Sequence, residues 1–114
     1  MLEPQEGECL VCFVERALAG TPCDRTRRWA GHFREVRVPG AVGLDRRLDD
    51  VGAGCDCAIR GRGYRLVREL CERDLDTDEL REPVPLPPCA GVRRTSARPC
   101  TNWVRHHRWD AVTW

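Results

Sequence analysis

The sequence predicts a small α+β domain that is rich in helix, and three observations lead to this prediction. The chain has 114 residues, which suits one domain. Its first half holds three stretches with apolar residues at helical spacing, and residues 52–67 combine glycines with short apolar runs. Prolines and turn residues dominate the end of the chain. We therefore expect a single domain with a helical core in residues 1–82 and a proline-rich connector with a loop-rich C-terminal segment in residues 83–114.

The first two helices are expected at residues 8–19 and 24–35. Gly20 ends the first helix, and Asp24 is the expected N-cap of the second. Both helices have a face that is suited to a hydrophobic core. The first face consists of Leu10, Val11, Phe13, Val14, Ala17 and Leu18, and the second has Trp29 and Phe33 one turn apart.

The third helix is expected between Pro39 and Gly52, with Leu44 and Leu48 at helical spacing. From Gly52 the glycines predict a tight turn that opens a short strand around residues 55–59. The run at residues 64–67 fits either a strand or a helix. An exposed acidic segment follows before the proline-rich connector.

Composition excludes several classes of protein. The net charge is only +1, which argues against a uniformly basic nucleic-acid coat. All basic residues are arginine, so a lysine Schiff base or a lysine general base is excluded. No apolar run approaches the length of a membrane span. Residues 1–8 hold three acids and no base, unlike a secretory signal, so we expect a cytoplasmic protein whose thiols stay reduced or bind metal.

The eight cysteines are the main functional signal. Cys9 and Cys12 form a C-x-x-C pair at the start of the first helix, where the helix dipole favours thiolates. Cys55 and Cys57 form a C-D-C pair that a turn can orient to one side. Together the two pairs predict a tetrahedral zinc site, in which Cys23 could replace one member.

Other interpretations of these cysteines stay open at this point. Cys9 and Cys12 could instead form a redox dithiol in a sensor or an oxidoreductase. Four thiolates would also accept an iron–sulfur cluster, and buried cysteines can simply pack as small apolar residues.

Cys71, Cys89 and Cys100 form a looser second set. The turn-rich loop between Cys89 and Cys100 could be closed by a second metal, by a disulfide or by neither. With His106 or His107, the three thiols would complete a Cys₃His set, although adjacent histidines in a polar tail are more typical of solvated residues.

The pattern of motifs resembles an uncharacterised bacterial family, which is known as a domain of unknown function. The family is marked by an N-terminal C-x-x-C and a C-D-C. The segments that carry the resemblance are Glu8-Cys9-Leu10-x-Cys12, Cys23-Asp24, Cys55-Asp56-Cys57, Cys89-x-Gly91-Val92-Arg93-Arg94 and Pro99-Cys100-x-x-Trp103. After the C-D-C, this sequence has Ala58 and Arg60-Gly61 where the family pattern has an acidic residue and a later Asn. The resemblance groups the cysteines and implies no activity.

No enzyme motif is readable, since the chain has one serine, Ser96, and no phosphate-binding glycine loop. A Cys–His pair stays open, but a non-catalytic module is the preferred interpretation. Such a module would act through contact with an unknown protein or with nucleic acid. Arginines interleave with tryptophan and histidine from Arg93 to Trp109, so phosphate and base contacts are one interpretation and core packing of the tryptophans is the other. The candidate contact residues are Arg93, Arg94, Trp103 and Arg105.

Overall fold

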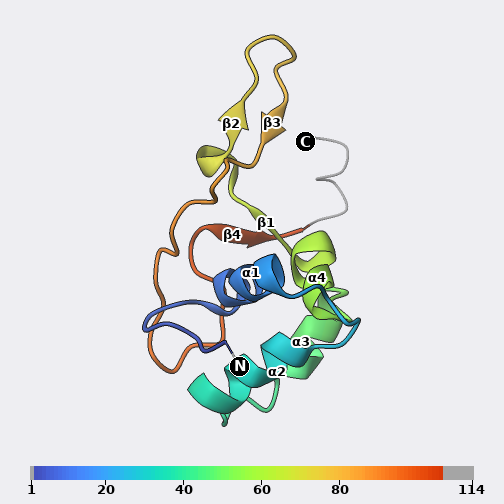
Figure 1. Ribbon diagram of the computed structural model, residues 1–114, viewed down its shortest axis with the longest axis vertical. Coiled ribbons are helices and arrows are strands. Elements are labelled where there is room, and N and C mark those ends of the chain that lie inside the picture. The colour runs from blue at the N-terminus through green and yellow to red at the C-terminus, as the bar shows by residue number, and fades with distance from the viewer. Residues whose placement is uncertain (1, 107–114) are drawn as a thin grey trace.

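Three helices form the first half of the chain, as the sequence predicts. The structure is a computed structural model that describes residues 2–106. The helices are α1 (Leu10–Gly20), α2 (Arg28–Arg37) and α3 (Leu44–Asp50). Figure 1 shows α1 lying across the middle of the molecule, with α2 and α3 on one side of it and a pair of short strands on the other.

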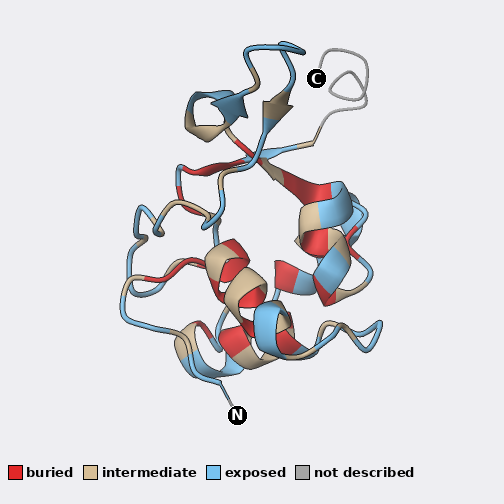
Figure 2. Cartoon of the chain, turned by 45° about the horizontal axis from the view of Figure 1, so that its top comes forward, coloured by how far each residue is buried: buried red, intermediate tan, exposed pale blue. Residues whose placement is uncertain are grey.

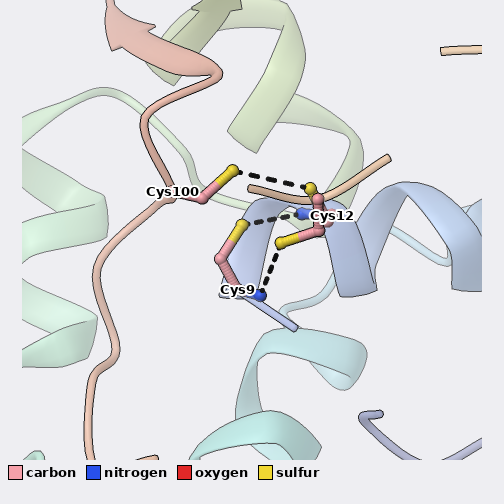
Figure 3. Close-up of side chains that lie close together, drawn as sticks. Cys9, Cys12 and Cys100 are labelled. Atoms are coloured by element: carbon pink, nitrogen blue, oxygen red, sulfur yellow. Dashed lines mark hydrogen bonds between the residues drawn. The ribbon is translucent and has the colours of Figure 1, made fainter. Parts of the chain in front are cut away.

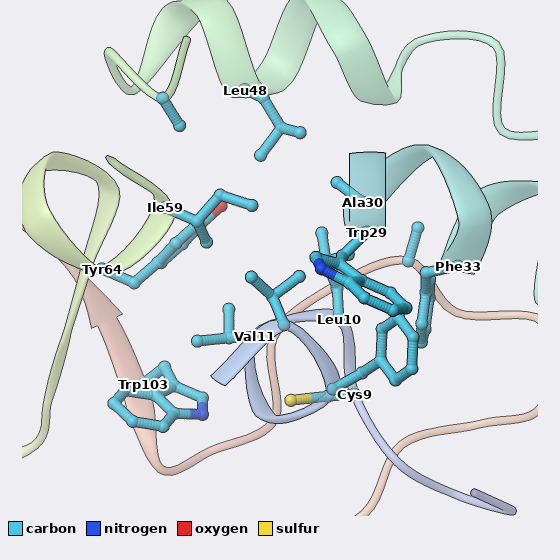
Figure 4. Close-up of a cluster of buried hydrophobic side chains, with 14 of the residues drawn as sticks. Cys9, Leu10, Val11, Trp29, Ala30, Phe33, Leu48, Ile59, Tyr64 and Trp103 are labelled. Atoms are coloured by element: carbon cyan, nitrogen blue, oxygen red, sulfur yellow. The ribbon is translucent and has the colours of Figure 1, made fainter. Parts of the chain in front are cut away.

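A single hydrophobic cluster joins these elements. The predicted apolar face of α1 is buried, and Phe13 contacts Trp29 edge to face with ring centroids 6.0 Å apart. Phe33 also packs against Phe13, at 5.8 Å between ring centroids. Full burial of such side chains stabilises a fold by about 1.5–3 kcal/mol each. Figure 4 shows side chains from α1, α2, α3, residues 59–64 and the C-terminal strand meeting in this cluster, among them Leu10, Val11, Trp29, Phe33, Leu48, Ile59, Tyr64 and Trp103.

Helix α2 begins later than the sequence predicts. Asp24 is not its N-cap, because the Asp24 carboxylate instead accepts the backbone N–H of Thr26 at 3.0 Å and closes a local turn. Residues 24–27 therefore form a loop before the helix starts at Arg28. The buried residues Trp29 and Phe33 keep their predicted places on its inner face.

The strand expected around residues 55–59 is instead helical. A short turn, α4 (Asp56–Ala58), continues into a π-helical turn, η1 (Ile59–Gly63), and the strand β1 follows at Tyr64–Leu66. The helical conformation is favoured here because it buries Asp56 and Ile59 on the same side.

Two antiparallel strand pairs complete the α+β fold. Strand β1 pairs with β4 (Trp103–Arg105), so that Leu66 lies opposite Trp103 and the C-terminal segment is fixed to the core. After a 3₁₀ turn, η2 (Arg68–Leu70), the strands β2 (Glu72–Arg73) and β3 (Leu80–Arg81) form a hairpin.

The acidic segment of the sequence forms this hairpin, and it projects from the helical core. Its side chains are exposed or half-buried, as Figure 2 shows at one end of the molecule. Beyond β3, the connector has no helix or strand between residues 82 and 102 and runs back beside α1 (Figure 1). Within residues 2–106, no helix has the length and apolar character that a membrane span requires.

Candidate metal centres

The structure gathers seven of the eight cysteines into two separate groups. The four-cysteine group consists of Cys9, Cys12, Cys89 and Cys100, and the three-cysteine group consists of Cys23, Cys55 and Cys57. Within each group, all sulfur atoms lie within 4.8 Å of one another. Tetrahedral zinc with Zn–S bonds of about 2.3 Å separates its sulfurs by about 3.8 Å. Both groups are therefore close to the spacing of thiolates around one metal ion.

The N-terminus of α1 supplies two members of the four-cysteine group. Cys9 is the N-cap residue, and its sulfur accepts the backbone N–H of Cys12 at 3.3 Å. The sulfur of Cys12 lies 3.9 Å from that of Cys100, which approaches from the C-terminal segment (Figure 3). The first helical turn therefore directs both of its thiols toward a residue that lies 88 positions away from Cys12 in the sequence.

Cys89 joins the group through a tight backbone loop. Its sulfur accepts the N–H of Cys9 at 3.3 Å and the N–H of Gly91 at 3.4 Å. Gly91 has a φ of 92°, a conformation that favours glycine, and this positive φ belongs to the turn that brings its N–H back to the sulfur. Val92 then donates its N–H to the carbonyl of Gly7 at 2.9 Å. These bonds fasten the Cys89 loop to the segment that precedes α1.

Trp103 covers the four-cysteine group on the side of strand β4. The indole N–H of Trp103 donates to the sulfur of Cys12 at 3.2 Å. The guanidinium of Arg60 lies 4.3 Å from the centre of the Trp103 ring, and Glu15 holds this arginine through an ion pair of 2.9 Å. Donors to metal-bound sulfur orient the ligand and tune the metal, so Trp103 has the position of a supporting residue of a metal centre.

The charges of this group favour a cation. The Cys12 side chain donates a hydrogen bond to Cys9, and this bond lowers the pKa of the Cys9 thiol to about 5. The pKa of Cys12 is raised by the same bond, and the pKa of Cys100 is raised chiefly by burial. One thiolate therefore forms readily, whereas further ionisation is opposed until a positive charge enters. A divalent cation bound by these sulfurs would remove this opposition and displace the remaining protons.

The three-cysteine group lies near the surface. The sulfurs of Cys55 and Cys57 are 3.3 Å apart, and the side chain of Cys57 is exposed. Cys55 has an extended backbone and Cys57 lies in the helical turn α4, so their side chains do not alternate as they would in a strand. Cys23 comes from the loop before α2, where its sulfur accepts the N–H of Arg25 at 3.3 Å.

The aspartate of the C-D-C pair fixes this arrangement. Asp56 is 1% exposed, and its carboxylate accepts the N–H groups of Trp29 at 2.8 Å and Ala30 at 3.1 Å. It is therefore the N-terminal cap of α2, supplied from a distant segment. The N–H of Asp56 also donates to the carbonyl of Thr26 at 2.9 Å. These bonds clamp the Cys23 loop against the turn that carries Cys55 and Cys57.

The pKa shifts in the three-cysteine group resemble those in the four-cysteine group, because one thiol has a lowered pKa and another has a raised pKa. A backbone hydrogen bond from Cys57 lowers the pKa of the Cys23 thiol. The pKa of Cys57 rises to about 11, chiefly because its thiol is hydrogen-bonded to Cys55. Burial raises the pKa of Asp56, although the two N–H groups of α2 oppose this rise.

The five cysteines predicted as ligands are divided between the two groups. Cys9 and Cys12 lie at the start of α1, whereas Cys23 follows its end and lies with Cys55 and Cys57. Helix α1 has 11 residues, and at about 1.5 Å per residue it separates the two locations by about 16 Å. The two close pairs therefore do not meet at one ion. Cys9 and Cys12 lie with Cys89 and Cys100, whereas Cys55 and Cys57 lie with Cys23.

Sequence reasoning did not assign Cys89 and Cys100 to the C-x-x-C pair. The signal was present in the Cys-Ala-Gly turn at Cys89, because a glycine two residues after a cysteine suits a loop with N–H bonds to sulfur. Cys71 lies in neither group. It lines a pocket together with His106. His107 lies outside the described residues.

The predicted partner-binding residues differ in exposure. Arg93, Arg94 and Arg105 are exposed. Trp103 is buried, and its ring packs in the core. Its indole N–H donates to the Cys12 sulfur, and the Arg60 guanidinium lies over one face of its ring. Trp109 lies outside the described residues.

Comparison with known protein families gives one match. The family described as "Protein of unknown function (DUF2695)" has a model that matches residues 10–60. This match confirms the resemblance to an uncharacterised family over α1 to α4, a segment that contains the whole three-cysteine group and only Cys12 of the other. Comparisons with curated proteins and with solved structures found no match.

Proposed function

We propose that the chain is a small zinc-binding module in which Cys9, Cys12, Cys89 and Cys100 hold a structural Zn²⁺. One observation carries the proposal. Four sulfurs from the two ends of the described chain lie within 4.8 Å of one another inside the fold. Four thiolates around zinc are the usual composition of a closed structural site. An iron–sulfur cluster fits this spacing less well, because its cysteines bind two or more iron atoms and are therefore spread more widely than four thiolates around a single ion.

The role of the metal follows from the elements it joins. Cys9 and Cys12 belong to α1, whereas Cys89 and Cys100 belong to a segment that has little regular secondary structure. Apart from the sulfur contacts, this segment is held by single hydrogen bonds, such as the one from the Val92 N–H to the Gly7 carbonyl, and by the short β1–β4 pairing that follows it. Zinc would therefore supply a large part of the free energy that fastens residues 89–100 to the helical core.

Metal content of single-cysteine variants tests this proposal. Cys89→Ser and Cys100→Ser each remove one ligand, and we expect each to lose the zinc of the four-cysteine group. Cys71→Ser is the matched control, because Cys71 is half-buried like Cys89 and belongs to neither group. Elemental analysis of protein purified under reducing conditions makes the measurement. Unchanged zinc content in both ligand variants would contradict the proposal.

The zinc-bound loop presents a basic surface, and we propose that it contacts a phosphate-bearing partner. Arg93 and Arg94 are exposed between Cys89 and Cys100, and Arg105 is exposed on β4. Because Trp103 is buried, this contact would rest on arginine and phosphate and not on stacking with that ring. Binding to a nucleic acid should then weaken steeply with salt. A double variant, Arg93→Ala with Arg94→Ala, should bind nucleic acid with a weaker salt dependence. A gel-shift assay measures the salt dependence of binding in both the wild type and the variant. Absence of a gel shift at low salt would exclude nucleic acid and leave a protein as the candidate partner.

The thiol-redox alternative also has an observation in its favour, namely the lowered pKa of Cys9. A reactive thiol must also be accessible, and the side chain of Cys9 is fully buried at 0% exposure. Alkylation at mildly acidic pH separates the two functions. A zinc site predicts that Cys9 is protected until a chelator is added, whereas a redox pair predicts selective modification of Cys9 in the untreated protein.

A further inference from the structure

The three-cysteine group has the chemistry of a metal site but not the enclosure of the other group. Its sulfurs lie within 4.8 Å of one another, and the described residues provide no fourth side chain of a ligating type within that distance. Cys57 is exposed, and Cys23 and Cys55 are half-buried. One side of the group therefore faces solvent.

A pocket opens on that side. It has a volume of about 490 Å³ and is lined by Cys55, Cys57, Arg62 and small residues, among them Gly52, Gly54 and Gly61. A Cβ atom on Gly54 or on Gly61 would meet nothing within 4 Å, so neither glycine packs closely against other residues. Arg62 contributes a positive charge at the rim of this pocket.

The thiols are held in place without a metal. Asp56 ties their turn to α2 through two N–H bonds, and the Cys23 loop is closed by Asp24, which accepts the N–H of Thr26. The N–H of Arg25 orients the sulfur of Cys23. A site whose ligands are fixed beforehand loses little conformational entropy when it binds an ion.

Three protein ligands with one free position distinguish exchangeable and reactive zinc sites from structural ones. We propose that Cys23, Cys55 and Cys57 bind a second thiophilic divalent cation, with zinc as the physiological choice, whose fourth coordination position opens on the pocket of Arg62. The three thiolates and the cation together carry a charge of −1, which the nearby arginine balances in part. The fourth position takes a small exogenous donor, and the arginine favours an anionic one. This site is independent of the proposed structural zinc, because the two groups share no ligand.

Cobalt substitution tests the site in the full chain, since the visible spectrum of Co²⁺ responds to its ligands. The wild type should bind two Co²⁺ per chain, and its spectrum should change when azide or imidazole is added. Cys57→Ser alters an exposed residue. This variant should bind one Co²⁺, and neither azide nor imidazole should change its spectrum. Cys23→Ser should behave in the same way, whereas Cys71→Ser should match the wild type. Circular dichroism verifies that each variant is folded.

Arg62→Ala separates the anion preference from the metal site itself. We expect it to weaken azide binding about two- to fivefold and to leave neutral imidazole unaffected. Equal azide affinity in this variant would overturn the role of Arg62. One Co²⁺ per chain in the wild type, with no change in Cys23→Ser or Cys57→Ser, would overturn the second site and leave the four-cysteine proposal intact. Loss of cobalt only in those two variants would instead retain the second site and remove the first.

Discussion

The four-cysteine group lies between α1 and the C-terminal segment with Cys9 and Cys100 buried and Cys12 and Cys89 half-buried, whereas none of the three-cysteine group, beside α2 and α4, is buried. Both use backbone N–H donors to hold sulfur, and both have one thiol whose pKa is lowered by hydrogen bonds from another cysteine. They differ in the number of ligands and in exposure. On the proposed assignments, the comparison teaches that similar thiol chemistry would support a closed structural centre or an open exchangeable one, depending on what surrounds it.

The largest expected effect comes from opening the closed group. Cys12→Ser removes the sulfur that contacts both Cys100 and the Trp103 indole. Because structural zinc contributes its binding free energy to folding, we expect a loss of more than about 4 kcal/mol in the free energy of unfolding. Chemical denaturation measures this loss. The paired change Cys57→Ser in the open group should cost far less, and equal losses would remove the distinction between the groups.

The Asp56 cap should have the next largest effect. Asp56→Ala leaves two buried N–H groups of α2 without their acceptor, so we expect a loss of about 2 kcal/mol in the free energy of unfolding. It should also weaken metal binding by the three-cysteine group, because the Cys23 loop loses its clamp. Asp74→Ala is the matched control, since Asp74 also accepts two backbone N–H groups, those of Asp76 and Thr77, but lies in the projecting hairpin. A smaller loss in Asp56→Ala than in this control would contradict the clamp.

The Trp103 indole tests the supporting contact of the closed group. Trp103→Phe keeps an aromatic ring near Arg60 and deletes the N–H that donates to Cys12. Loss of such a contact typically lowers metal affinity 10–100-fold, and we expect an effect of about that size in competition with a chelator. Trp29→Phe serves as the comparison, because this buried indole ring packs edge to face on Phe13. Unchanged metal affinity in Trp103→Phe, or equal effects in both variants, would show that the contact has no influence on the metal.

The smallest effect is expected in the projecting hairpin. Arg81 forms an exposed pair with Glu72 at 3.7 Å, and exposed pairs contribute about 0–1 kcal/mol. Arg81→Ala should therefore change the free energy of unfolding by less than about 0.5 kcal/mol and leave metal content unchanged. A thermal denaturation series with elemental analysis checks both statements. A large loss here would mean that the hairpin supports one of the two centres.

The local features of the fold could be predicted from the sequence, but the partnerships between distant segments could not. Helical spacing identified the buried face of α1 and the inner residues Trp29 and Phe33, because periodicity is a local property. The cap of α2 could not be found in this way, since Asp56 is supplied from another segment and replaces the expected Asp24.

The same limit applies to the cysteines. Their spacing identified two pairs with the chemistry of metal ligands, and the structure keeps each pair together. Spacing does not state which pair meets which distant thiol. Cys89 reaches Cys9 across 80 residues because the connector runs back beside α1, and no local pattern encodes that path.

Native mass spectrometry of the zinc-loaded chain during titration with a chelator tests the central claim most directly. We predict that two zinc ions per chain leave in separate steps. The first should leave at low chelator concentration while the fold is retained, and Cys57→Ser should abolish this step. The second should leave only as the protein unfolds, and Cys89→Ser should abolish that step. A single zinc ion, or two ions that leave together in one step, would contradict the distinction between a closed and an open centre.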